Sequence, residues 1–293
     1  MSSGSQSDSE APVAADPDLP AVPVTEIGRE KGSLAGEFRQ LWEYRDLLVL
    51  LTRRDLSVRY KQSAIGVWWA IVQPLVLMGI FSVVFGRLAS LPSEGVPYPL
   101  FALGGLLPWL FFSRALSGAS ESLVSSASLV TKVYFPRLVL PISKVVSGLV
   151  DLGIAFGLLL AALAWYQVLP GWQILFLPVF VGIATLTALA LGLWLAALNV
   201  RYRDVGLLVP FLIQVWMYAS PIAYSASLVP DRWRWAYDLN PVAGVVQGFR
   251  WCLFGTEPPA AMPLILSMAG VLVLLFTGLL NFKRAERDFA DVI

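Results

Sequence analysis

The stretch from Leu152 to Val200 contains no Asp, Glu, Lys or Arg over 49 consecutive positions. A helix needs about 20 apolar residues to cross the roughly 30 Å hydrocarbon core of a bilayer, so this run is too long for a single helix. The segment Gln167–Gly171 lies in its middle and ends in Pro-Gly, which is a turn signal. We therefore predict two membrane-spanning helices here, joined by a turn. The first of them begins upstream, near Pro141.

Charge is sparse in the rest of the chain as well. Only 14% of the 293 residues are charged, whereas soluble domains average about 25%. Further uncharged runs of spanning length flank the central pair, so we predict an all-α integral membrane domain over residues 34–293 with six transmembrane helices. The predicted spans cover residues 67–86, 95–113, 141–166, 174–198, 205–229 and 258–282.

Two uncharged segments just before the last span are too short to cross a bilayer. They are Leu239–Phe249 and, after Arg250, Trp251–Gly255. Short apolar segments of this kind are typical of re-entrant or interfacial half-helices, and that is what we predict for them.

The N-terminal region differs from the apolar remainder. Residues 1–33 are rich in Ser, Pro, Ala, Asp and Glu, which predicts a disordered tail, and they lack the basic and apolar segments of a signal peptide. Residues 37–62 place Tyr44, Leu47, Leu48 and Leu51 on one helix face, with charges elsewhere. We interpret this region as an amphipathic helix lying on the membrane surface. An ordinary soluble amphipathic helix is the alternative.

Lysine and arginine are distributed unevenly about the predicted spans. Of the 21 such residues, 17 fall on the side that holds both chain ends, and only Arg87, Arg232, Arg234 and Arg250 fall on the other. Cytoplasmic loops of membrane proteins are enriched in Lys and Arg. The pattern predicts a multi-pass protein with both termini in the cytoplasm.

The residue types that most catalytic and metal sites need are missing. The chain has no histidine, a single cysteine (Cys252) and no G-x-x-x-x-G-K-[ST] phosphate loop. We therefore expect no catalytic residue, no metal, no cofactor and no ATPase site within this chain. The net charge of +1 gives no sign of a nucleic-acid partner.

Several motifs follow one another along the chain. The segment from Arg53 reads RRDLSVRYKQSAIGVWWAIVQPL; later segments read KVYFP (132–136), NVRYRDV (199–205), ASPI (219–222), LNP (239–241) and GFR (248–250). In this order they resemble the permease subunits of ABC-2 type exporters of polysaccharides and polyol phosphates, the O-antigen and teichoic acid export family. The resemblance covers about residues 40–293 and leaves out the N-terminal tail.

The resemblance implies a transport subunit in the bacterial cytoplasmic (inner) membrane. It implies a homodimer of this chain bound to two copies of a separate ABC ATPase, which exports a lipid-linked polysaccharide such as an O-antigen, a galactan or a teichoic-acid-like polymer. Two other functions stay open. One is an ABC-2 permease for a drug or a lipid. The other is a membrane enzyme acting on polyprenyl-phosphate sugars, which would need clustered acidic residues that the spans do not offer.

Two groups of charged residues are candidates for contact with the ATPase. They are Arg53, Arg54, Arg59 and Lys61 in the surface helix, and Arg201, Arg203 and Asp204 in the short turn between spans four and five. The first group could instead pair with anionic lipid headgroups, worth about 1 kcal/mol per residue. The second could be only a topology signal.

Polar residues at membrane depth are candidates for the translocation path: Gln73, Asp151, Gln214, Trp216, Tyr218 and Tyr224. Asp151 and Lys144 are seven residues apart and so share a helix face. An ionisable residue in a span usually faces a bundle interior or a cavity. Lys144 could instead snorkel to the surface while Asp151 pairs locally. The polar residues of spans one and five could equally form hydrogen bonds between helices without contacting substrate.

Overall fold

The computed structural model describes residues 34–61 and 66–286. The tail predicted over residues 1–33 lies outside these ranges. The chain divides into two units, Met1–Arg39 and Gln40–Ile293, and the architecture below is that of the second.

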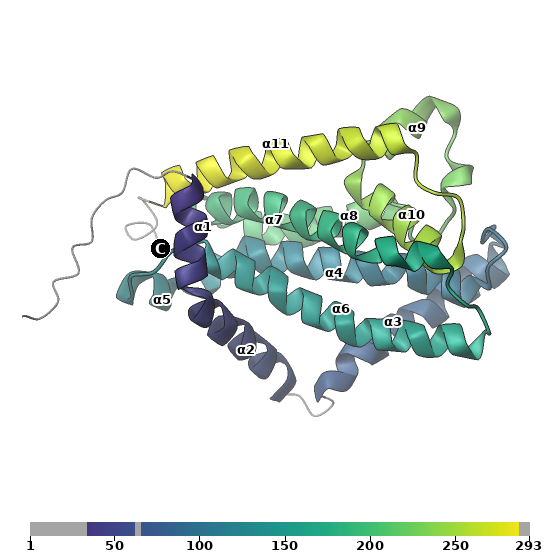
Figure 1. The fold of residues 1–293 in the computed structure, drawn as a ribbon, viewed down its shortest axis with the longest axis horizontal. Helices are drawn as coiled ribbons and strands as arrows, with labels where there is room; N and C mark the ends of the chain where they lie inside the picture. The colour runs from purple at the N-terminus through teal and green to yellow at the C-terminus, as the bar shows by residue number, and fades with distance from the viewer. Residues whose placement is uncertain (1–33, 62–65, 287–293) are drawn as a thin grey trace, which may run out of the picture. The chain divides into compact units, whose positions relative to one another are not determined.

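Every element of the described residues is a helix, and the long ones run side by side (Figure 1). They are α1 Leu34–Glu43, α2 Arg45–Lys61, α3 Trp69–Phe81, α4 Tyr98–Ser125, α5 Ala127–Lys132, α6 Val139–Trp165, α7 Leu177–Arg201, α8 Val205–Tyr218, α9 Asp231–Asp238, α10 Pro241–Phe254 and α11 Ala261–Ala285. Short 3-10 segments lie at Gly66–Trp68, Trp172–Phe176 and Ala226–Leu228, and a π-helical segment at Ser82–Leu88 continues α3.

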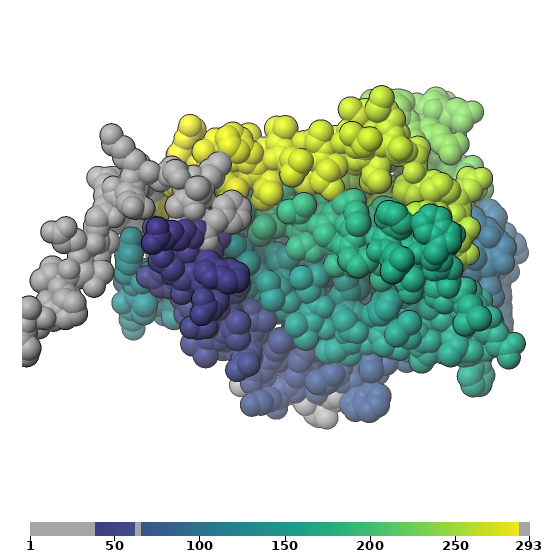
Figure 2. Space-filling model, viewed as in Figure 1, coloured from purple at the N-terminus to yellow at the C-terminus, as the bar shows by residue number. Residues whose placement is uncertain are grey.

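The core is built around α4, which packs against α3, α6, α7, α8 and α10. Its residues 100–107 are all buried. Gly192 allows α7 to approach α4 closely, because a Cβ atom there would lie 2.6 Å from the Cβ of Ala119. In contrast, α11 lies on the outside of the bundle, yellow in Figure 2, and exposes apolar side chains such as Ile265 and Val273. This is the surface expected of a helix solvated by lipid.

Five helical segments are long and apolar enough to cross a membrane: Gly66–Leu88, Tyr98–Ser125, Val139–Trp165, Trp172–Arg201 and Ala261–Ala285. They lie where spans one, two, three, four and six were predicted, and a turn separates the third from the fourth at residues 166–171. The second is longer than predicted, since α4 continues past residue 113 through Arg114 and Glu121. Arg114 does not end the helix because Asp151 and Gln73 accept its hydrogen bonds.

The predicted span over residues 205–229 is too long. α8 ends at Tyr218 after 14 residues, which is about 21 Å of helix at roughly 1.5 Å per residue. Pro221 supplies the physical reason, because proline has no N–H to donate and restricts the residue before it. Residues 219–225 form an irregular turn instead. The fifth predicted span is therefore a shorter apolar helix.

The two short segments predicted before the last span form one helix. α10 runs without interruption from Pro241 to Phe254 and includes Arg250, which the sequence analysis had treated as a boundary. Gly255 ends α10 with a positive φ of 67°, a backbone conformation that glycine adopts without steric cost.

The predicted surface helix over residues 37–62 is two helices rather than one. α1 and α2 are separated at Tyr44, and residue 62 lies outside the described ranges. α2 packs along α6, with Leu51 buried in the contact.

Candidate functional site

A buried carboxylate on α6 gathers polar groups from three other helices. Asp151 is 3% exposed and accepts hydrogen bonds from Arg59 and Tyr60 of α2. Arg114 of α4 approaches the same carboxylate at 3.4 Å and also donates to the Oε1 atom of Gln73 on α3. We call these five residues the Asp151 cluster. It joins α2 to the first three predicted spans.

The hydroxyl of Tyr60 acts as a donor in this cluster. Burial of the phenol, together with its hydrogen bond to Asp151, raises the pKa of Tyr60 to about 12. The hydroxyl therefore keeps its proton at physiological pH.

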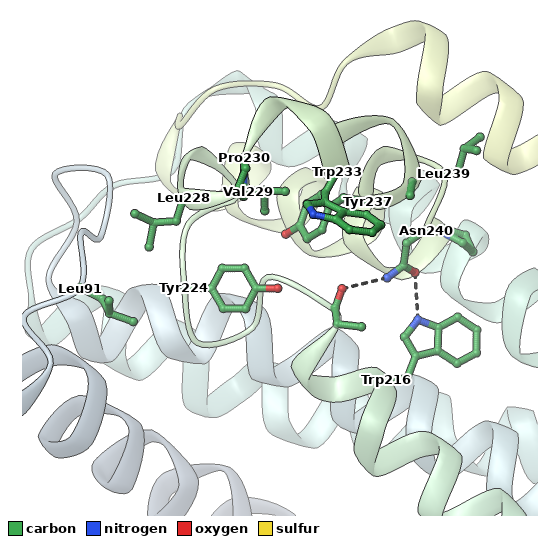
Figure 3. A pocket seen from close by; sticks show the side chains of 13 residues that line it. Leu91, Trp216, Tyr224, Leu228, Val229, Pro230, Trp233, Tyr237, Leu239 and Asn240 are labelled. Atoms are coloured by element: carbon green, nitrogen blue, oxygen red, sulfur yellow. Dashed lines mark hydrogen bonds between the residues drawn. The ribbon is translucent and has the colours of Figure 1, made fainter.

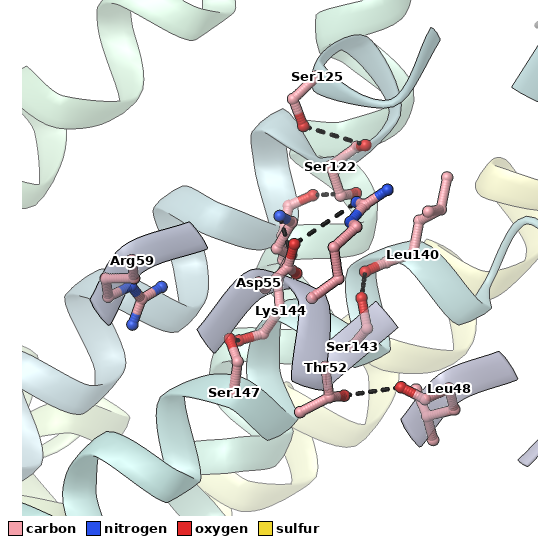
Figure 4. Close-up of polar contacts among 12 residues, drawn as sticks. Leu48, Thr52, Asp55, Arg59, Ser122, Ser125, Leu140, Ser143, Lys144 and Ser147 are labelled. Atoms are coloured by element: carbon pink, nitrogen blue, oxygen red, sulfur yellow. Dashed lines mark hydrogen bonds and ion pairs between the residues drawn. The ribbon is translucent and has the colours of Figure 1, made fainter. Parts of the chain in front are cut away.

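A second ion pair ties α2 to α6 further along both helices. The Nζ atom of Lys144 lies 2.9 Å from the Oδ2 atom of Asp55, and Figure 4 shows the two side chains meeting between the helices. Asp55 precedes Arg59 by four residues, so the two lie one above the other on one face of α2. Lys144 and Asp151 both face α2, as their seven-residue spacing on α6 predicted for a shared face.

A cavity of about 510 Å³ opens beside the Asp151 cluster. It lies among α2, α3 and α4. Its lining residues are Arg59, Tyr60, Trp69, Ala70, Gln73, Val76, Leu77 and Arg114. The cavity thus has two guanidinium groups on one wall and apolar side chains on the other.

A larger cavity, of about 930 Å³, lies beyond the end of α8 that is opposite the Arg201–Asp204 turn (Figure 3). We call it the Trp216 cavity. It is bordered mainly by aromatic and aliphatic side chains, with one amide: Leu91, Trp216, Ala219, Tyr224, Leu228, Val229, Pro230, Trp233, Ala236, Tyr237, Leu239, Asn240 and Pro241. Among these lining residues none is charged.

Hydrogen bonds hold the polar residues of the Trp216 cavity in place. The Nε1 atom of Trp216 donates to the Oδ1 atom of Asn240 at 3.0 Å, and the Nδ2 atom of Asn240 donates to the Oγ atom of Ser220 at 3.0 Å (Figure 3). The Trp216 ring also makes an edge-to-face contact with Phe112 of α4, with 5.3 Å between ring centroids. Burial raises the pKa of the Tyr237 phenol, which stays neutral. The cavity therefore offers aromatic faces and neutral hydrogen-bonding groups.

Arg250 fixes the turn that follows α8, and the sequence analysis missed this role. Its side chain is 2% exposed and donates to the carbonyls of Ile222 (2.9 Å), Phe101 (3.3 Å) and Tyr224 (3.4 Å). The guanidinium also stacks on the Phe101 ring, 3.4 Å from its centroid. A Cβ atom on Gly105 would lie 2.9 Å from the guanidinium, so glycine leaves room for it. The available signal was a lone arginine in an apolar run, which is costly in a membrane unless it has partners.

The predicted path residues therefore fall into three places. Gln73 and Asp151 belong to the Asp151 cluster, and Trp216 and Tyr224 line the Trp216 cavity. Gln214 and Tyr218 lie four residues apart on the open side of α8, where Tyr218 is 64% exposed. Within one chain the six predicted path residues thus form three separate pairs, and they do not line a single channel.

The predicted coupling residues are separated as well. Arg53, Arg54 and Lys61 are exposed, as are Arg201, Arg203 and Asp204 in the turn between α7 and α8. Arg59, in contrast, is held by Asp151. α5 and the loop after it were not predicted; in this loop Val133 and Tyr134 are strongly exposed beyond the extended end of α4.

Comparisons with known proteins agree with this architecture. Residues 46–254 match the family model described as ABC-2 type transporter. The chain is 32% identical over 258 residues to an O-antigen export system permease protein RfbA of Myxococcus xanthus, an alignment that covers 87% of this chain and 98% of that protein. It is 27% identical over 249 residues to the RfbA permease of Klebsiella pneumoniae, covering 85% and 95% of the two chains.

A further relative is the polysialic acid transport protein KpsM of Escherichia coli, which is 24% identical over 252 residues and is covered to 91% of its length. The family model spans more than half of the chain, and the Myxococcus relative is matched along nearly its whole length. The helices, the apolar surface and these matches lead to one assignment: the chain belongs to the ABC-2 type transporter family of membrane proteins.

Proposed function

We propose that this chain is the membrane-spanning subunit of an ATP-driven exporter that moves a lipid-linked polysaccharide outward across the bacterial cytoplasmic membrane. The observation that carries the proposal is the match, over 87% of the chain, to a permease named for O-antigen export. The cargo is an O-antigen, a galactan or a teichoic-acid-like polymer.

The Trp216 cavity suits a sugar chain chemically. Aromatic faces stack on the apolar faces of sugar rings, and the side chains of Asn240 and Tyr224 exchange hydrogen bonds with hydroxyl groups. A conducting path needs sites that bind weakly and repeatedly. Uncharged groups of this kind provide such sites, and we place the exit of the path here.

The path itself lies between two copies of the chain. The bundle of one chain is filled by α4, which leaves no wide passage through its centre. The open face of α8, with Gln214 and Tyr218, is the seam at which a second copy packs. There these two residues meet substrate together with Trp216 and Tyr224. Gln73 borders the cytoplasmic part of the same path, and Asp151 supports this part from behind Arg59 and Arg114.

The topology we propose has six membrane crossings and both termini in the cytoplasm. α8 is the fifth crossing, and α9 and α10 form a re-entrant segment on the outer side before α11. The excess of Lys and Arg near the two ends of the chain supports this orientation.

A separate ATPase supplies the energy, with two copies docking on the cytoplasmic ends of the dimer. The exposed Tyr134 beside α5 and the exposed charges of the Arg201–Asp204 turn support this docking surface. Arg53, Arg54 and Lys61 lie on α2 and contact the ATPase or anionic lipid headgroups.

A pair of variants tests the proposed cargo path. A strain lacking the chain should accumulate lipid-linked polysaccharide inside the cell, and the wild-type gene should restore surface polysaccharide. Trp233→Leu removes one aromatic face of the Trp216 cavity and should lower export several-fold. Leu91→Val, also in the cavity wall, is the matched control and should export normally. Normal surface polysaccharide in the deletion strain would refute the function. Normal export by Trp233→Leu would refute the path.

A further inference from the structure

The Asp151 cluster contains more positive than negative charge. Arg59 and Arg114 both pair with Asp151, and among the described residues no second carboxylate lies within ion-pair distance of either arginine. The neighbouring carboxylate, Asp55, is engaged with Lys144. One positive charge therefore remains uncompensated beside the cavity, a costly arrangement near a bilayer unless an anion completes it.

The donors of the cluster are accessible from the cavity. The Arg59 side chain is 41% exposed and the Arg114 side chain 28%, whereas Asp151 is buried behind them. Both guanidinium groups line the cavity, and no acidic residue does so. A guanidinium carries five N–H donors, and only some of them are used here. An anion in the cavity can thus reach both arginines.

The walls of the cavity and its depth restrict the ligand further. Arg114 lies about 24 Å along α4 from Tyr98, and Asp151 about 21 Å along α6 from Trp165, at roughly 1.5 Å per residue. Both positions lie about 6–9 Å inside the far boundary of a hydrocarbon core of about 30 Å, a distance at which long arginine side chains reach the headgroups. Trp69 and Val76 line the cavity and are themselves exposed at the surface of α3. The ligand is therefore an amphiphile, with an anionic group and apolar chains.

We infer that the Asp151 cluster and its cavity bind the phosphate headgroup of a lipid, with Arg59 and Arg114 contacting the phosphate oxygens and Trp69 contacting the apolar chain. Guanidinium groups match phosphate geometry in a bidentate manner. The cavity volume of about 510 Å³ is in the range of small-molecule sites, which run from about 300 to 1,000 Å³. Asp151 pairs with both arginines in the absence of lipid and competes with the phosphate for them when lipid binds.

The inference rests on the proposed function in one respect, the source of the phosphate. A lipid phosphate is present in a bulk anionic phospholipid and equally in the phosphorylated carrier of an exported glycan. The binding site itself is independent of that choice, and it can be tested without any transport assay.

The test measures lipid binding to the purified full-length chain by native mass spectrometry. The probes are phosphatidylglycerol, which carries a phosphate, and diacylglycerol, which does not. Arg114→Gln should weaken binding of phosphatidylglycerol about tenfold, the effect expected for loss of one hydrogen bond to a charged group. It should leave diacylglycerol binding unchanged. Arg114→Lys retains the charge but loses the bidentate geometry, so its affinity should lie between those of the wild type and Arg114→Gln. Arg232→Gln, which replaces an exposed arginine of α9, is the matched control.

The variant Asp151→Asn shows whether the Asp151 cluster is a binding site or only holds the helices together. Removing the competing carboxylate should strengthen phosphatidylglycerol binding several-fold, the opposite of the effect of Arg114→Gln. If both variants bind the two lipids as the wild type does, or if both lose the two lipids equally, the site is not a phosphate site and the inference fails. If Arg114→Gln does not fold, Arg59→Gln gives the same comparison from α2.

Competition identifies the form of the phosphate that the site holds. Inorganic phosphate at millimolar concentration should displace phosphatidylglycerol only weakly, because it lacks the apolar chains. Strong displacement would overturn the role of the apolar wall. Export measured on the same variants is a separate readout. If the wild-type chain binds phosphatidylglycerol as expected while the deletion strain shows normal surface polysaccharide, the proposed function fails and this site stands.

Discussion

Arg250 and Arg114 are both arginines within apolar helices, and the protein compensates them in opposite ways. Arg250 donates to three backbone carbonyls and stacks on Phe101, and no described carboxylate lies within ion-pair distance. Arg114 has side-chain partners, Asp151 and Gln73, and faces an open cavity. The first is almost fully buried, and the second is accessible.

A membrane protein can thus use one residue type for two purposes. Backbone carbonyls are held by the fold, so the partners of Arg250 cannot change without unfolding the turn after α8. Side chains can rotate away, so the partners of Arg114 can be exchanged for a ligand. We expect the region around Arg250 to set stability and the Asp151 cluster to set binding and export.

Replacing Arg250 should have the largest effect on stability. Arg250→Leu removes a donor from three carbonyls, two of them in buried contacts, and also the ring contact with Phe101; an unsatisfied buried group costs about 1–3 kcal/mol. We expect a loss of about 3 kcal/mol or more, measured as a large fall in Tm of the purified chain in detergent. Arg232→Leu on the exposed face of α9 should change Tm little. If Arg250→Leu were as stable as this control, Arg250 would not stabilise the chain, and it would not differ from Arg114 in the way described above.

Replacing Asp151 should destabilise the chain less, and in a manner that lipid can repair. Asp151→Leu leaves two partly exposed guanidinium groups without their carboxylate, for which we expect a loss of about 1–3 kcal/mol. Added phosphatidylglycerol should restore part of the lost Tm, because its phosphate replaces the carboxylate. The same lipid should not rescue Arg250→Leu. Equal rescue of both variants would show that the two regions do not differ.

The Asp55–Lys144 pair should behave as an exchangeable contact between α2 and α6. Asp55→Lys alone places two cations together and should destabilise the chain, and so should Lys144→Asp. The double variant restores an ion pair in reversed order, and we expect a coupling of about 1 kcal/mol in a double-mutant cycle of unfolding free energies. Additive effects of the two single changes would mean that the pair contributes nothing to holding α2 on α6.

Charge reversal in the turn between α7 and α8 should change stability least. Arg201, Arg203 and Asp204 are exposed, and surface substitutions usually stay within about 0.5 kcal/mol. Export should nevertheless fall in the triple variant Arg201→Glu, Arg203→Glu, Asp204→Lys, since the turn lies on the proposed ATPase-docking face. Full export would identify these charges as a topology signal only.

The features that the sequence predicted well depend on local signals. The turn near Gln167 follows from the Pro-Gly pair next to it, and the five helices long and apolar enough to cross a membrane follow from long runs with few charges. Gln73 and Asp151 were selected as polar residues at membrane depth; the structure shows their partners, and their place in a translocation path stays a prediction. These inferences need no knowledge of which helix lies beside which.

The features that it missed depend on contacts between distant segments. α4 continues through Arg114 because its partner lies on α6, and α10 continues through Arg250 because carbonyls of residues 101, 222 and 224 accept its hydrogen bonds. Charge alone marked both positions as helix ends. The early end of α8 had a local signal in Pro221, but the apolar residues after it outweighed that signal in the prediction.

In the six-span topology proposed above, the short length of α8 has a consequence for the bilayer. This helix has 14 residues, or about 21 Å, against a hydrocarbon core of about 30 Å. A span shorter than the hydrocarbon core is matched by local thinning of the bilayer around the protein. In the proposed export, a polar polymer passing beside α8 therefore has to be shielded from hydrocarbon over less than the full membrane thickness. The work of the proposed transport then depends on the shape of the membrane as well as on the protein.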